Sequence, residues 1–145
     1  RIRQQQLIEV GNEWGFTLDS VPGYPFGKIL VAGHPGKLVK LAVGDWDTHS
    51  ARSGRAVTAV ASRAERLFNR SFADAVTAEG IFSSLEAREA ATLATALAHE
   101  IRQAVAGRRA GRGKIAVAVA LTDMQGRIIG TEGDLAAWQE ETPKS

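Results

Sequence analysis

The sequence predicts an α/β fold: a small mixed sheet with a strand–Gly loop–helix unit and a C-terminal hairpin, with helices packed on the sheet. Residues 28–32 form a continuously apolar run, which is typical of a buried parallel strand. Residues 114–121 alternate large aliphatic residues with alanines, and a glycine turn leads into a returning strand over 127–131. Apolar residues at helical spacing occupy much of the remaining chain, which predicts helices between and before these strands.

The first helix is expected over about 4–20, where apolar residues recur at helical spacing. Gly11 and Gly15 lie inside it, and each costs a helix roughly 1 kcal/mol relative to alanine. We therefore expect close packing at both glycines, against backbone or a ligand. The Pro-Gly-Tyr-Pro segment at 22–25 ends this helix.

The middle of the chain predicts further helices. A short one is expected over 37–43, after the strand and its Gly-His-Pro-Gly loop, and an amphipathic one over about 55–69. A short helical turn is expected over 71–79.

A Ser-x-x-Glu pattern from Ser83 to Glu86 predicts a capping box at the start of the next helix, which ends at Gly107. On the strand at 114–121, the alanine face is expected to carry a closely packed helix.

Composition narrows the class of protein. The chain has 145 residues, of which 44% are hydrophobic and 23% charged, as in a single globular domain or a fragment of a longer protein. It contains no cysteine, which excludes disulfides, thiolate catalysis and cysteine-type zinc sites. No segment approaches the roughly 18 apolar residues of a membrane-spanning helix. We therefore expect a cytoplasmic protein without membrane contact.

A basic stretch near the end of the long helix raises the question of nucleic-acid binding. The net charge is only +2, and no aromatic residues are interleaved for base stacking. A solvated helix end with its following loop is the favoured interpretation, and nucleic acid is an unlikely partner. The basic residues are Arg102, Arg108, Arg109, Arg112 and Lys114.

The loop between the strand at 28–32 and the following helix has the composition of an anion site. Gly33 and Gly36 allow a sharp turn and a close approach to a ligand, and a helix N-terminus presents free N–H groups. Lys37 adds a full positive charge in the first turn. These features suit a carboxylate or a phosphate, although an ordinary structural turn is an equal alternative. The spacing is neither that of a P-loop nor that of a Rossmann glycine motif.

Three histidines are candidates for chemistry. His49, between Thr48 and Ser50, could orient a substrate carboxylate or move a proton near neutral pH. His34 could take part in binding or cap a backbone group, and His99 is expected to be structural or exposed. The alternation of Asp45, Asp47 and His49 imitates a metal site, but capping and loop hydrogen bonds are favoured, and no metal site is expected.

The run Val-Ala-Gly-His-Pro-Gly-Lys-Leu-Val-Lys-Leu-Ala at 31–42, followed by Gly44 and by Thr-His-Ser at 48–50, resembles the signature of the cobalt-precorrin-5B C(1)-methyltransferase family. The Asn-Glu-Trp-Gly-Phe segment at 12–16 resembles that family's Asn-x-x-Gly-aromatic helix. The strand at 117–121 and the hairpin after it resemble its C-terminal hairpin. The order and spacing of these segments hold over nearly all of the chain.

This resemblance implies S-adenosylmethionine-dependent methylation of C-1 of cobalt-precorrin-5B in anaerobic cobalamin biosynthesis. The cobalt belongs to the substrate. Residues 1–145 would be the C-terminal ligand-binding domain of a longer enzyme whose N-terminal domain is absent, so the chain alone is expected to be inactive. The resemblance leaves open whether the chain forms a homo-oligomer. The alternative function is a non-catalytic small-anion or nucleotide-binding module.

The site that the resemblance implies has His49 as its catalytic residue. Residues 33–37 and 48–50 are expected to form one concave pocket wall, and Lys37, Lys40, Arg52 and Arg55 to meet the carboxylates of the substrate. The residues expected to bind substrate or methyl donor are Gly33, His34, Gly36, Lys37, Lys40, Thr48, Ser50, Asn12 and Gly15.

Overall fold

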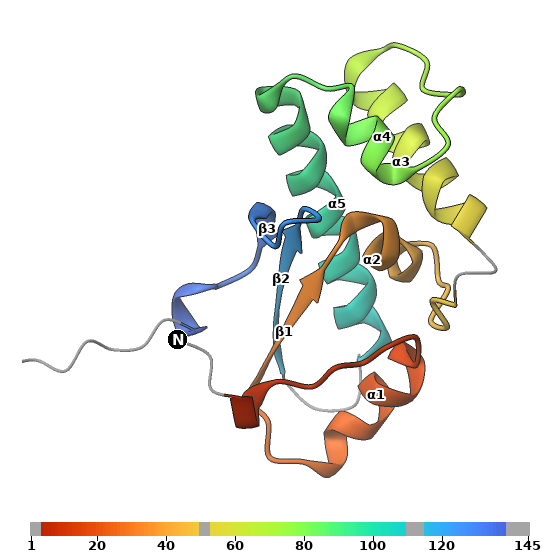
Figure 1. The fold of residues 1–145 in the computed structure, drawn as a ribbon. Helices are drawn as coiled ribbons and strands as arrows, with labels where there is room; N and C mark the ends of the chain where they lie inside the picture. Colours follow the sequence, from red (N-terminus) through yellow and green to blue (C-terminus); the bar gives the residue numbers. More distant parts are fainter. Residues whose placement is uncertain (1–3, 50–52, 110–114, 139–145) are drawn as a thin grey trace, which may run out of the picture.

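The computed structural model describes residues 4–49, 53–109 and 115–138. It confirms the α/β class, with a mixed sheet of three strands in the order β1-β2-β3. Strand β1 (Lys28–Gly33) pairs in parallel with β2 (Ala116–Thr122), and β2 pairs antiparallel with β3 (Ile128–Glu132) (Figure 1). The hairpin is therefore confirmed, and the parallel pair is joined by a long crossover that contains most of the helices.

Five α-helices and three short 3-10 turns complete the described chain. The α-helices are α1 (Trp14–Ser20), α2 (Pro35–Ala42), α3 (Ser53–Phe68), α4 (Ala78–Ser83) and α5 (Ala87–Arg108). The 3-10 turns are η1 (Gln4–Gln6), η2 (Val21–Gly23) and η4 (Ala136–Trp138).

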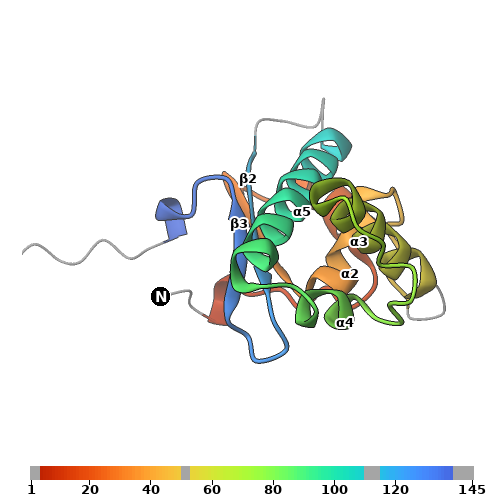
Figure 2. The same cartoon turned by 90° about the horizontal axis from the view of Figure 1, so that it is seen from above.

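The helices of the crossover, α2 to α5, lie on one side of the sheet, whereas η4 lies on the other side (Figure 2). Helix α5 contacts both β2 and β3, and α2 packs against α5 and α3. The core side of α5 carries Leu93, Leu97 and Ile101, all fully buried at helical spacing, as its periodicity predicts. No helix in the described ranges is long and apolar enough to cross a membrane.

The helices cover the opposite face of β2 from the one expected. Val117, Val119 and Leu121 join the core cluster that includes α5, whereas Ala118 and Ala120 lie outside that cluster. The close approach of α5 is made instead at Gly130 of β3, where an added Cβ would lie 2.6 Å from the Cβ of Ala94. Large aliphatic side chains fill the space between sheet and helices, and one glycine provides the close contact.

Strand β1 is less buried than its continuous apolar run suggests, because it lies at the edge of the sheet. Val31 is buried, while Ile29 and Leu30 are half-buried and Ala32 is exposed. The apolar run identified the strand correctly, but its position in the sheet depends on which strands pair with it.

The first helix is much shorter than expected. Only a 3-10 turn lies at Gln4–Gln6, and α1 begins at Trp14. Gly11 adopts φ +59°, a left-handed conformation that interrupts a right-handed helix and that glycine adopts without strain. Nothing lies within 4 Å of a Cβ added at Gly11, so its role is conformational and the expected close packing there is wrong.

Two helix starts also differ from the prediction. The turn expected over 71–79 is not helical before α4, which spans Ala78–Ser83. The capping box lies three residues later than expected: Glu86 is the N-cap of α5, and its backbone N–H donates to the carboxylate of Glu89 at 3.2 Å. Ser83 is instead the last residue of α4, with Ser84 as its C-cap, so only residues 84–86 separate the two helices.

Candidate functional site

Helix α2 begins directly at the carboxyl end of β1, two residues earlier than expected, with His34 as its N-cap. The Nδ1 atom of His34 accepts a hydrogen bond from the backbone N–H of Gly36 at 3.1 Å. The His34 carbonyl oxygen accepts from the N–H groups of Lys37 and Leu38, and Pro35 has no N–H. Every N–H of this first turn is therefore satisfied within the chain. The positive charge that the loop offers is the ammonium of Lys37, an exposed residue.

The other ring nitrogen of His34 is also engaged. Its Nε2 lies 3.0 Å from Oε2 of Glu79, in the first turn of α4. Because Nδ1 accepts a hydrogen bond, the neutral ring carries its proton on Nε2 and donates it to the carboxylate. Helix α4 also contacts the loop at Gly36, where an added Cβ would lie 3.1 Å from the Cβ of Ala78. His34 thus joins the glycine loop to α4.

Lys40 is a buried residue of α2, with 3% of its surface exposed. Its Nζ donates to the backbone carbonyl oxygens of Thr48 and His49, each at 3.1 Å. A buried ammonium requires acceptors of this kind, since it has left its water shell. The side chain of Lys40, one of the basic residues expected at the site, therefore contacts the main chain of Thr48 and His49.

The segments at 12–15 and 46–48 lie side by side. The Asn-x-x-Gly segment and the Thr-His segment, which both carry the family resemblance, are therefore in contact. The Asn12 carbonyl accepts from the Thr48 N–H at 3.1 Å, and the Asn12 side-chain oxygen lies 3.5 Å from the Thr48 hydroxyl. The Gly15 N–H donates to the carbonyl of Trp46 at 3.1 Å. An added Cβ at Gly15 would lie 3.2 Å from the Cβ of Trp46, so the close packing expected at this glycine is confirmed.

Trp46 is partly buried against the hydrophobic core and also packs against a cation. The guanidinium of Arg108 lies 4.6 Å from its ring centroid, and the same guanidinium makes two hydrogen bonds to Asp19, at 3.1 and 2.7 Å. Such stacking contributes about 0.5–1 kcal/mol at exposed sites. Arg108 therefore joins the end of α5 to α1 and to the signature loop.

Within the basic stretch, the described arginines serve mainly as internal anchors. Arg109 is 4% exposed and donates to the carbonyl of Leu18 at 2.7 Å. Arg102 donates to the carbonyl of Val117 at 2.8 Å. These contacts favour the structural interpretation of the stretch over a nucleic-acid surface. Arg112 and Lys114 lie outside the described residues.

His49 is exposed, and its backbone N–H donates to Oδ1 of Asp47 at 3.2 Å. Asp47 thus makes the loop hydrogen bond expected of it, and the described residues contain no group of three or more potential metal ligands. Ser50 and Arg52 lie outside the described residues.

The two halves of the expected pocket wall approach α2 at different points. His34 caps its N-terminus, whereas the carbonyls of Thr48 and His49 meet Lys40 six residues later, about 9 Å along the helix axis. One helix therefore positions both segments. A continuous wall formed by 33–37 and 48–50 stays a prediction.

Two contributors to this region were not identified from sequence. Glu79 is 45 positions from His34, and Arg108 is 89 positions from Asp19. Neither belongs to a recognisable motif, so no local pattern indicated these pairs.

Comparison with known proteins places this architecture in a family. The profile described as "CbiD, C-terminal domain" matches residues 47–133. The cobalt-precorrin-5B C(1)-methyltransferase of Syntrophotalea carbinolica is 42% identical over 139 residues, covering 96% of this chain and 39% of that protein. The protein of the same name from Ralstonia nicotianae is 33% identical over 148 residues, covering 93% of this chain and 38% of that protein.

A third relative of that name, from Methanococcus vannielii, is 51% identical over 49 residues, covering 34% of this chain and 13% of that protein. No solved structure matched. The chain thus spans about two fifths of the length of the two relatives that match it throughout. The profile match over 47–133, together with these identities, shows that the chain belongs to the CbiD C-terminal domain family.

Proposed function

We propose that this chain is the C-terminal part of a cobalt-precorrin-5B C(1)-methyltransferase, with S-adenosylmethionine as the methyl donor. The observation that carries the proposal is the 42% identity over 96% of the chain with a relative of that name. In this reaction the sulfonium–methyl bond breaks and a carbon–carbon bond to C-1 of the substrate forms. The donor leaves as a neutral thioether. A cytoplasmic location follows from the resemblance and is part of the proposal.

Lys37 is the residue proposed to bind a substrate carboxylate directly. It is exposed in the first turn of α2, and the substrate is a tetrapyrrole rich in acetate and propionate groups. A charge-assisted hydrogen bond from its ammonium fits such a group. The first-turn N–H groups of α2 already have partners, so this loop offers no backbone cradle for the methyl donor. Gly33 and Gly36 therefore serve to bring β1 and α2 together at the site.

His49 is proposed to orient a carboxylate or transfer a proton. Its side chain belongs to an exposed residue, while its carbonyl is fixed by Lys40. Thr48 is held by Asn12, and Gly15 holds the preceding Trp46, so these residues position the segment that presents His49. In this proposal the side chain of Lys40 holds the main chain of Thr48 and His49 in place. Ser50 is included because it follows His49 in the sequence.

The first experiment compares this chain with a version extended at its N-terminus to the length of the relatives. Both are incubated with cobalt-precorrin-5B and labelled S-adenosylmethionine. Methyl transfer needs reacting atoms about 3–3.5 Å apart, and a cleft between two domains usually holds two ligands together in this way. Label transfer is expected only with the extended protein. Transfer by the short chain at a comparable rate would refute the need for the longer protein.

The second experiment tests the site. In the extended protein, Lys37→Met is expected to lower kcat/KM by about 10- to 100-fold, the range of one charge-assisted hydrogen bond. The matched control is Lys28→Met, an exposed lysine at the opposite end of β1. Equal activity of the two variants would show that Lys37 does not bind the substrate. A protein that binds the tetrapyrrole without transferring label would instead support the alternative of a non-catalytic binding module.

A further inference from the structure

The segment 46–49, which presents His49, is held from two sides. Lys40 of α2 donates to the carbonyl oxygens of Thr48 and His49, each at 3.1 Å. On the other side, the Thr48 N–H donates at 3.1 Å to the carbonyl of Asn12, just before α1. The position of His49 relative to α2 therefore depends on where α1 lies.

Arg108, the last residue of α5, contacts both this segment and α1. Its guanidinium lies 4.6 Å from the centroid of the Trp46 ring. The same guanidinium makes two hydrogen bonds to the carboxylate of Asp19 in α1, at 3.1 and 2.7 Å. A planar guanidinium can stack on an aromatic ring and form a two-point contact with a carboxylate at the same time, which an ammonium cannot. One side chain therefore fixes the ring of Trp46 relative to α1.

Gly15 of α1 lies where these contacts converge. Its N–H donates to the carbonyl of Trp46 at 3.1 Å. A Cβ added at Gly15 would lie 3.1 Å from Nη2 of Arg108 and 3.2 Å from the Cβ of Trp46. Both distances are shorter than ordinary van der Waals contact, so a side chain here would push the guanidinium away from the ring. The glycine of the Asn-x-x-Gly segment thus leaves the space that Arg108 occupies.

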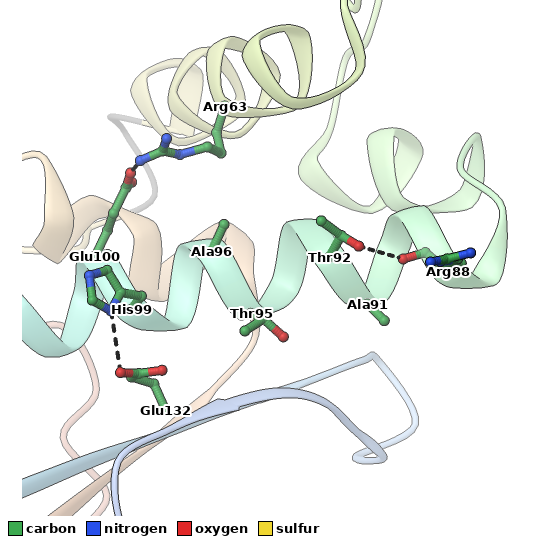
Figure 3. Close-up of a pocket in the computed structure, with 9 residues that line it drawn as sticks. All are labelled: Arg63, Arg88, Ala91, Thr92, Thr95, Ala96, His99, Glu100 and Glu132. Carbon is green, nitrogen blue, oxygen red and sulfur yellow. Dashed lines mark hydrogen bonds and ion pairs between the residues drawn. The ribbon is translucent and has the colours of Figure 1, made fainter.

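Other ion pairs hold elements on α5 at some distance from the candidate site. Figure 3 shows Arg63 of α3 beside Glu100, and Glu132 of β3 beside His99. These pairs attach α3 and β3 to the long helix. The contacts of Arg108 differ because its partners belong to α1 and to the segment 46–49.

We propose that Arg108, oriented by Asp19, is a positioning residue of the candidate site. Through the ring of Trp46 it fixes the segment that presents His49. This role rests on the proposed function, in which His49 orients a carboxylate or transfers a proton. Loss of Arg108 should loosen the segment locally and lower methyl transfer by misplacing His49.

Arg70 provides a matched control at the other end of α5. Its guanidinium lies 5.3 Å from the ring centroid of Phe72 and makes two hydrogen bonds to the carboxylate of Glu89, each at 2.9 Å. Glu89 lies in the first turn of α5 and Arg108 at its end, about 28 Å apart along the helix axis. Arg70→Met and Arg108→Met therefore remove the same kinds of contact from two different places.

The first measurement is amide hydrogen exchange in this chain, followed by NMR. The amides of Thr48 and Gly15 donate across the contact between the segment 46–49 and α1. Arg108→Met is expected to accelerate their exchange at least about tenfold relative to a buried amide of α5, whereas Arg70→Met should leave this ratio unchanged. Using a ratio separates local loosening from a loss of global stability. An unchanged ratio in Arg108→Met would overturn the proposal.

Two further variants vary the contact without deleting the cation. Arg108→Lys keeps a positive charge beside the ring but loses the two-point contact with Asp19, so its exchange ratio is expected to lie between those of Arg108→Met and the unmodified chain. Gly15→Ala displaces the guanidinium and is expected to accelerate exchange at Thr48. Exchange in Arg108→Lys as fast as in Arg108→Met, together with no acceleration in Gly15→Ala, would contradict the proposed contacts.

The second measurement is a double-mutant cycle in the extended protein. Arg108→Met is expected to lower kcat/KM by about 10- to 100-fold, because small misplacements of a reacting group are costly. Arg70→Met should lower it less than about threefold. Because Arg108 acts through His49, its effect should shrink to less than about threefold in a His49→Gln background.

The two measurements separate this proposal from the proposed function. An effect of Arg108→Met that is undiminished in the His49→Gln background would overturn the positioning role. If His49→Gln itself leaves kcat/KM unchanged while Arg108→Met accelerates exchange at Thr48, the proposed role of His49 fails and the anchoring of its segment by Arg108 stands.

Discussion

The Nζ atom of Lys40 lies 3.1 Å from the carbonyl oxygen of His49, and this contact fixes the backbone of an exposed histidine from the buried side of α2. The same Nζ reaches the carbonyl of Thr48 at the same distance. A lysine of the family signature therefore stabilises the loop from within the fold.

Replacing Lys40 should destabilise the chain far more than replacing its neighbour Lys37. Lys40→Met keeps the length of the side chain but leaves two carbonyl oxygens without their donor, which should lower the free energy of unfolding by about 1–3 kcal/mol. Lys37→Met removes an exposed charge and should change it by less than about 0.5 kcal/mol. Urea unfolding of both variants measures the difference. Equal stabilities would contradict an anchoring role for Lys40.

The cap of α2 can be tested with two substitutions of His34. His34→Ala removes the acceptor of the Gly36 N–H and should cost about 0.5–2 kcal/mol, whereas His34→Asn supplies a good N-cap side chain and should recover much of that loss. Thermal unfolding ranks the variants. Because both lose the contact with Glu79, a failure of asparagine to exceed alanine would show that the Glu79 contact, rather than the cap, stabilises this end of the helix.

Substitution by alanine should change the free energy of unfolding in opposite directions at two glycines, Gly130 and Gly107. At Gly130 an added Cβ would lie 2.6 Å from the Cβ of Ala94 and 2.7 Å from its carbonyl carbon, so Gly130→Ala must displace α5 from the sheet. We expect a loss of about 3 kcal/mol or more. At Gly107, inside α5, nothing lies within 4 Å of an added Cβ, and Gly107→Ala should stabilise by about 0.5–1 kcal/mol. Denaturant melts of both variants check the pair.

The ion pair between Arg70 and Glu89 should make stability depend on pH. The hydrogen-bonded Arg70 guanidinium is the main cause that holds the pKa of Glu89 below its ordinary value of 4.5, with a smaller contribution from the Glu86 backbone N–H. A lowered pKa in the folded state means that the stabilisation is complete above pH 4.5 and is lost as the pH falls through the lowered value.

Glu89→Gln should therefore have a lower Tm than the unmodified chain at pH 7, and the two Tm values should converge in strong acid. Arg70→Gln should show the same convergence, because protonated Glu89 no longer attracts the guanidinium. A Tm difference that persists unchanged into strong acid would contradict a role for the carboxylate charge.

Local pattern was sufficient for the strands and for the long helices. The alternation in β2, the apolar run of β1 and the helical spacing in α3 and α5 each produce a face that is buried in the fold. Local pattern failed where two signals competed. Ser83 and Glu86 fit a capping box by type and spacing, yet the following Glu86-to-Glu89 pair forms the helix start.

Sequence patterns were sufficient to predict the α/β class, the order of strands and helices, and the glycine–histidine–lysine segment that carries the family resemblance. Three features became visible only in the folded chain: β1 lies at an edge of the sheet, α5 contacts Gly130, and His34 contacts Glu79. The folded chain also shows that Lys40 points inward while Lys37 stays exposed, although both are lysines on one short helix. The physical reason is that periodicity reports only which residues share a face of one element. Partners distant in sequence become neighbours only when those faces pack, and then the buried groups must find hydrogen-bond partners inside the fold.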